Sequence, residues 1–154
     1  MDSLNSLRIM NWNSRSIRNK EGEFFDFIDN HKIDVAVVTE TWLQPNNSIF
    51  HPNYSCVRLD RSTQVANRGG GVAIFVREGI SFKQADGLNT TTIEAIQVTL
   101  NLVRTPVHII AAYFPGSSNR TILNNFKRDL RKITNFTEPS LLPWVIESYD
   151  PQQL

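Results

Sequence analysis

A short apolar run limits the folds open to this chain more than any other feature of its sequence. Within residues 33–39, Ile-Asp-Val-Ala-Val-Val-Thr, the four residues 35–38 are apolar at successive positions rather than at alternate ones. That pattern is typical of a strand buried on both faces. Glu40 follows directly. It is either an acid facing water at the end of a strand, or a ligand group, because open α/β sheets bind ligands beyond the carboxyl ends of their strands.

The segments around this run predict a layered α/β domain. A strand at 7–12 and a helix at 21–31, with an apolar stripe through Phe24, Phe25 and Ile28, precede it and form a β-α-β unit. Further strands are expected at 54–60, 70–78, 93–102 and 107–114, the last two as an antiparallel hairpin, followed by an amphipathic helix at 120–133. This order favours a mixed sheet in a layered α/β or α+β domain.

Composition narrows the class of protein. A chain of 154 residues with 40% hydrophobic content is long enough for one domain with its own core. The net charge of +1 excludes a global basic field, so any basic surface must be local. The single cysteine, Cys56, excludes an intrachain disulfide and a cysteine-based zinc site, and is expected to be a small buried residue. With no long apolar run and no signal-peptide pattern, we expect a soluble, intracellular protein without a membrane partner.

Polar side chains end three of the predicted strands. Asn13, Glu40 and Tyr113 each follow or close an apolar run, and the glycines at 69–71 would let backbone approach closely nearby. If the strands are neighbours, these groups share one pocket. A lone carboxylate suits Mg²⁺, which keeps several waters, and the chemistry suggested is phosphoryl hydrolysis. The alternatives remain open: Asn13 as a turn former and Tyr113 as an aromatic at the edge of the core.

Four segments carry a resemblance to a known family. "NWNSRSI", "DVAVVTETWL", "RGGGVAIFVR" and "AAYFPG" occur in the order and at roughly the spacing of the endonuclease/exonuclease/phosphatase family. The chain is most similar to the apurinic-type endonuclease domain of jockey-like non-LTR retrotransposons. The resemblance implies a sandwich of two mixed sheets flanked by helices, and a Mg²⁺-dependent phosphodiesterase, with Mn²⁺ as a substitute. It also implies a nuclear enzyme that nicks DNA to prime reverse transcription by a covalently linked reverse transcriptase domain.

The resemblance assigns roles to individual residues. Glu40 matches the family's metal-binding glutamate, and Asn13 matches its active-site asparagine. Tyr113 matches the tyrosine that contacts the scissile phosphate. Arg68 and the following glycines match a recurring segment that we interpret as structural, with a phosphate contact from the arginine. Physically, a carboxylate-bound cation stabilises charge on phosphate oxygens, and neutral donors hold a phosphate without repelling it.

The sequence also departs from the family pattern. Neither Gly-Asp-x-Asn nor Ser-Asp-His, which complete the family's site, occurs in these residues, and His31, His51 and His108 all look structural. We therefore divide the chain into residues 1–139, an N-terminal part of the family's domain, and an atypical tail at 140–154. A frameshift would explain the tail, because codons for Pro-Trp-Val-Ile, read two bases later, can spell x-Gly-Asp-x.

These departures set further expectations. Loss of a general base costs about 10²–10⁴-fold in rate, so this polypeptide alone is expected to be inactive, and missing strands would make it poorly stable. Two other function classes stay open. One is a different phosphatase of the same superfamily, and the other is a non-catalytic remnant that binds DNA weakly through local arginines. The oligomeric state is not predicted.

Overall fold

The chain begins with the predicted β-α-β unit. A computed structural model describes residues 6–61, 69–86, 88, 90–116, 118–135 and 144–148. In it, β1 (Ile9–Asn13) and β2 (Val35–Thr39) are parallel neighbours joined by the helix α1 (Glu21–Asn30). Their register runs from Ile9 opposite Val35 to Asn13 opposite Thr39. Both strands therefore end at the same edge of the sheet.

β2 is the buried centre of the first sheet. The sheet has the order β1-β2-β4-β3, in which β3 (Tyr54–Leu59) and β4 (Val72–Arg77) are antiparallel to each other and β4 is antiparallel to β2. All five residues of β2 are buried. Val35 and Val37 face the second sheet, whereas Ala36 and Val38 face α1. The expected burial of this strand on both faces is confirmed.

The second sheet contains the predicted hairpin and two strands that were not predicted. Its order is β5-β6-β7-β8, with β5 (Phe82–Gln84), β6 (Glu94–Leu100), β7 (Val107–Tyr113) and β8 (Trp144–Ser148). β6 and β7 are antiparallel, as expected for the hairpin, and β8 is parallel to β7. The atypical tail thus contributes a strand, while its residues 140–143 and 149–154 lie outside the described part of the chain.

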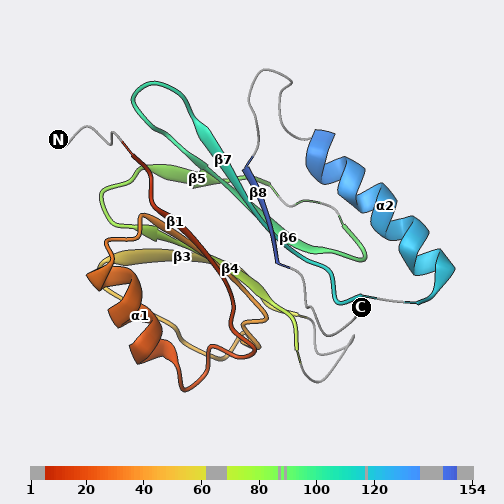
Figure 1. Ribbon diagram of the computed structural model, residues 1–154, viewed down its shortest axis with the longest axis horizontal. Helices are drawn as coiled ribbons and strands as arrows, with labels where there is room; N and C mark the ends of the chain where they lie inside the picture. Colours follow the sequence, from red (N-terminus) through yellow and green to blue (C-terminus); the bar gives the residue numbers. More distant parts are fainter. Residues whose placement is uncertain are drawn as a thin grey trace.

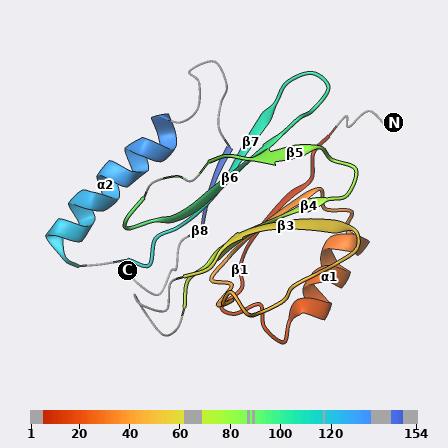
Figure 2. The ribbon, with the colours of Figure 1, turned by 180° about the vertical axis from the view of Figure 1, so that it is seen from behind.

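The elements stack in four layers, with α1 and α2 (Arg120–Asn135) on the two outer faces and the sheets between them (Figures 1 and 2). The sheets pack through an aliphatic core that includes Val37, Ile74, Val98 and Ile109. α1 buries Phe24, Phe25 and Ile28 against Phe75 and its neighbours. No helix among the described residues is both long enough and apolar enough to cross a bilayer.

α2 covers the outer face of the second sheet. Ile133 is fully buried there, and Phe126 and Leu130 are partly buried against Ile93 and Ile110. This arrangement leaves the opposite side of α2 exposed to solvent.

The free cysteine lies on β3. Cys56 is opposite Phe75 in the register of β3 and β4, and it is partly buried against the core beneath α1. Burial raises the pKa of the Cys56 thiol to about 11, which outweighs the lowering effect of the Arg58 charge. The thiol is therefore protonated at neutral pH.

A glycine run brings the start of β4 against the end of β2. Gly69, Gly70 and Gly71 all have left-handed φ values, of 86°, 68° and 86°. Their carbonyl groups accept hydrogen bonds from the segment after β2, where the amide of Thr41 donates to Gly71 at 3.2 Å and that of Trp42 donates to Gly70 at 3.0 Å. A methyl group on Gly71 would collide with the Thr41 hydroxyl. The close backbone approach expected of this run is confirmed.

A buried carboxylate anchors α2 to the loop before β6. Asp129 is fully buried, and its Oδ2 accepts hydrogen bonds from the amides of Thr91 at 2.9 Å and Thr92 at 2.8 Å and from both threonine hydroxyls. Burial alone would raise the pKa of this carboxyl group. The hydrogen bonds outweigh burial and lower its pKa below the usual value of 3.8.

Replacing Gly71 should destabilise the fold more than replacing a glycine in open space. Gly71→Ala combines a left-handed φ with a collision, and we expect it to lower the free energy of unfolding by about 2 to 4 kcal/mol. Gly79→Ala is the matched control, because Gly79 has a φ of 92° but nothing within 4 Å of the added methyl group. It should cost about 1 kcal/mol. Urea unfolding of both variants tests this, and equal losses would contradict it.

Asp129→Asn should lower the free energy of unfolding at pH 7 by about 1.5 to 3 kcal/mol, because a charged acceptor of several hydrogen bonds is lost. The pKa of Asp129 is lower in the folded state than in the unfolded state. Its contribution is therefore complete above the unfolded pKa near 3.8 and is lost as the pH falls through the folded pKa. Denaturant titrations at several pH values should show this acid-dependent loss in the parent chain and a smaller one in the variant. If the free energy of unfolding of the two proteins changed with pH in parallel, Asp129 would not be the group responsible for the loss at acid pH.

Candidate functional site

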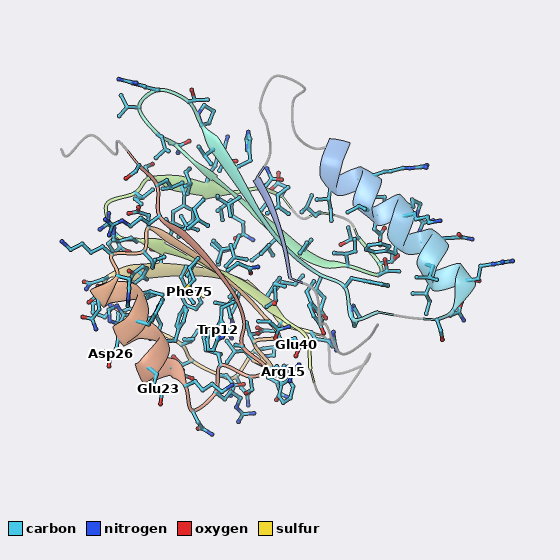
Figure 3. The ribbon with its side chains drawn as sticks, in the orientation of Figure 1. Trp12, Arg15, Glu23, Asp26, Glu40 and Phe75 are labelled. Atoms are coloured by element: carbon cyan, nitrogen blue, oxygen red, sulfur yellow. The ribbon has the colours of Figure 1, made fainter. Side chains whose placement is uncertain are left out.

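The carboxyl ends of strands from both sheets meet at one edge of the sandwich. β1 and β2 end there in the first sheet, and the C-terminal end of β7 reaches it from the second. The starts of the antiparallel strands β4 and β6 lie at the same edge. Figure 3 shows Glu40 close to Arg15 at this edge, away from the exposed acids of α1. We call this region the strand-end site.

Glu40 occupies a constrained position at the end of β2. It has a left-handed φ of 51°, which is costly for a residue other than glycine, and only 6% of its surface is exposed. The segment after β1 holds this turn in place. The Ser16 amide donates to the Glu40 carbonyl at 2.8 Å, and the Ser14 hydroxyl donates to the same oxygen at 2.9 Å. The carboxylate is therefore presented by a fixed turn and is not a solvent-facing strand-end acid.

Tyr113 reaches Glu40 from the other sheet. It closes β7, is 6% exposed, and lies on the inner face of the second sheet with Ala111 and Ile109. Its hydroxyl donates a short hydrogen bond to Oε1 of Glu40. The structure thus brings together two of the residues singled out from the sequence, although 73 positions separate them in the chain.

Asn13 ends β1 opposite Thr39, the residue before Glu40. Its side-chain oxygen accepts a hydrogen bond from the Arg15 amide at 3.2 Å, which is the turn-forming contact considered in the sequence analysis. This contact fixes the orientation of the amide, whose NH₂ end is a hydrogen-bond donor. Arg68, the fourth candidate, lies outside the described residues.

Two charged residues at the strand-end site were not assigned to it from the sequence. Nε of Arg61 lies 2.5 Å from Oε1 of Glu94, and the amide of Gly71 donates to Oε2 of Glu94 at 2.7 Å. Glu94 is opposite Tyr113 in the register of β6 and β7, and Cζ of Arg61 lies 5.9 Å from the centre of the Tyr113 ring. This ion pair therefore links the glycine run to the strand that carries Tyr113.

A weak signal for Glu94 was present in the sequence. It lies two positions before Ile96 in a strand whose even-numbered residues face the core, so an acid there points inward. Arg61 gave no comparable signal, because it follows the end of a strand and enters a polar loop.

The strand-end site offers few metal ligands from the described residues. No group of three or more His, Cys, Asp and Glu side chains gathers within the described ranges. The histidines have other contacts: His31 bonds the Phe27 carbonyl, His51 stacks on Phe25, and His108 lies 2.9 Å from the Thr99 hydroxyl. The site therefore combines one buried carboxylate with a phenol and an amide, together with a nearby ion pair.

Comparisons with known proteins show the family to which the chain belongs. The Endonuclease/Exonuclease/phosphatase family matches residues 10–146. The RNA-directed DNA polymerase from mobile element jockey of Drosophila funebris is 28% identical over 110 residues. That match covers 71% of this chain but only 12% of the relative, so the chain spans a small part of its relative's length.

Solved structures share the fold. The endonuclease domain of TRAS1, a telomere-specific non-LTR retrotransposon, aligns with a TM-score of 0.58 at 18% identity, covering 83% of this chain and 54% of that domain. A family protein from Leptotrichia buccalis aligns with a TM-score of 0.63 at 16% identity, covering 91% of this chain and 66% of that protein. These likenesses confirm the two-sheet α/β architecture. Because the family match spans most of its length, the chain belongs to the endonuclease/exonuclease/phosphatase family.

Proposed function

We propose that the strand-end site is part of a retrotransposon-type DNA endonuclease that hydrolyses phosphodiester bonds with Mg²⁺. The observation that supports this most is the buried contact between Glu40 and Tyr113 across the two sheets. Burying the Glu40 carboxylate to 6% exposure in a left-handed turn costs free energy, and binding of a cation would offset that cost. The family of the chain and its likeness to jockey sequences agree with this proposal.

The donor atoms of the site suit a hard cation that is shared with substrate. Mg²⁺ is usually bound by one or two carboxylates, with water and phosphate oxygens in its other positions. Glu40 supplies one such carboxylate at the strand-end site, and Tyr113 keeps it oriented. A cation bound there would stabilise negative charge on the phosphate oxygens and lower the pKa of a bound water. We expect Mn²⁺ to substitute for Mg²⁺.

The neutral groups would position the phosphate. The Tyr113 hydroxyl and the Asn13 NH₂ can each donate a hydrogen bond to a phosphate oxygen without adding charge. The contact between Asn13 and the Arg15 amide fixes the direction of the asparagine before substrate binds. Arg68 remains a predicted phosphate contact.

The groups that would activate water are proposed to lie elsewhere in a longer polypeptide. Gly-Asp-x-Asn and Ser-Asp-His do not occur among these 154 residues. In the parent element we expect a linked reverse transcriptase domain and action on nuclear DNA. Of the two units proposed for the chain, residues 1–139 would carry this half of the site.

The proposed endonuclease activity can be tested by cleavage of supercoiled plasmid. The 154-residue chain alone should not nick DNA in Mg²⁺, whereas a longer polypeptide read through the restored downstream frame should. Glu40→Gln in that longer polypeptide should lower the rate by at least about 10²-fold, because the metal ligand is lost. Glu23→Gln, an exposed acid on α1, is the control and should change nothing. Nicking that persists at the parent rate with Glu40→Gln would refute the proposed role of this residue.

Metal binding by Glu40 can be tested without measuring DNA cleavage. The 154-residue chain should bind Mn²⁺ weakly, because one protein carboxylate and water give little affinity. The Mn²⁺ electron paramagnetic resonance signal reports free ion, so binding can be measured directly. Glu40→Gln should abolish the binding and Glu23→Gln should leave it intact. If both variants bind equally, Glu40 does not hold the ion.

A further inference from the structure

The two outer helices of the sandwich carry opposite charge. Residues 21–30 of α1 contain four acidic side chains and no basic one. Residues 120–135 of α2 contain five basic side chains and one acid, Asp129, which is buried. The net charge of α2 is therefore +4, and since the whole chain has a net charge of +1, the remainder has −3. Figure 1 places the two helices on opposite outer faces.

The basic residues of α2 form one continuous surface. All five are exposed, and we call them the α2 basic face: Arg120, Lys127, Arg128, Arg131 and Lys132. With 3.6 residues per turn, Arg120, Lys127 and Arg131 fall within about 40° of one another on the side opposite the buried Ile133. At 1.5 Å per residue, this stripe is about 16 Å long. It is the outermost part of the layer that covers the second sheet.

This concentration of charge is unfavourable for an isolated helix. Solvated helices usually alternate acids and bases, which form favourable pairs at i and i+4. Here Lys127 and Arg131 are like charges at that spacing, as are Arg128 and Lys132, and each such pair costs about 0.2 to 0.5 kcal/mol. Lys132 has Oδ1 of Asp129 at 3.9 Å, while Oδ2 of the same carboxylate accepts hydrogen bonds from Thr91 and Thr92, so a single buried acid accompanies the five basic side chains of α2. A bound polyanion would remove this repulsion.

We propose that the α2 basic face docks the phosphate backbone of double-stranded DNA. The choice of DNA as the partner rests on the proposed function, whereas the inference that α2 binds a polyanion rests on its charge alone. Arg120 follows Tyr113 by seven positions, so at most about 25 Å of chain separates the start of the basic stripe from the end of β7. DNA bound along α2 contacts a surface separate from the proposed site of cleavage, and the acidic α1 face lies on the opposite side of the molecule.

The test measures binding without cleavage. Fluorescence anisotropy of a labelled duplex of about 20 base pairs is followed with the 154-residue chain in EDTA, from about 50 to 200 mM salt. The test variant is R120Q/K127Q/R131Q. The control is K32Q/K83Q/R104Q, which removes the same charge from exposed residues in three other segments. Circular dichroism establishes that each variant is folded, and glutamine keeps a high helix propensity in α2.

The expected result is a loss of affinity specific to α2. The α2 variant should bind at least about tenfold more weakly than the parent, and its slope of log affinity against log salt should fall by about 2 to 3, since each released phosphate contact contributes about 0.9. The control should change affinity less than about threefold. Equal losses in both variants would overturn the proposal, because net charge alone would then explain binding.

Other occupants give different results. A second copy could place its acidic α1 on this face in a head-to-tail contact. Self-association in sedimentation that the α2 variant abolishes, without DNA binding by the parent, would overturn the proposal. Tighter binding of single-stranded RNA than of duplex DNA would overturn the choice of DNA. Binding in EDTA requires neither the metal nor cleavage, so failure of the nicking experiment leaves this test intact.

Discussion

The face-to-face packing of the two sheets is the interaction on which the rest of the structure depends. Val37 and Ile74 from the first sheet meet Val98 and Ile109 from the second in one aliphatic core. Because Glu40 belongs to one sheet and Tyr113 to the other, their hydrogen bond exists only when this core is formed. Apolar burial, which is not directional, thus positions a polar contact, which is directional.

Much of the fold could be predicted because its signals are local. The apolar run of β2, the stripe of α1 and the alternation in β6 and β7 each reflect the burial of that segment itself. β5 has only three residues, too few for a period to be recognised. β8 was not predicted because its tail differs from the family pattern, and its strand conformation depends on pairing with β7, far earlier in the chain.

The strand-end site was predictable in its positions but not in its contacts. The ends of apolar runs identified Asn13, Glu40 and Tyr113, because strand ends converge at a sheet edge. The left-handed turn at Glu40 depends on hydrogen bonds from Ser14 and Ser16, which come from another strand end. The ion pair between Arg61 and Glu94 joins residues 33 positions apart. The alternation in β6 indicates which face Glu94 takes, but its partner and the hydrogen bonds at Glu40 arise only in the assembled fold.

The reactivity of the partly buried Cys56 thiol depends on whether β3 is paired with β4. With a pKa of about 11, about one thiol in 10⁴ is ionised at pH 7, and the ionised form is the one that reacts with alkylating reagents. Modification is therefore slow while β3 stays paired with β4. Each time β3 separates from the sheet, solvent reaches the sulfur and its pKa returns toward the ordinary value. The rate of alkylation thus reports the fraction of molecules in which this edge of the first sheet is open, without any added label.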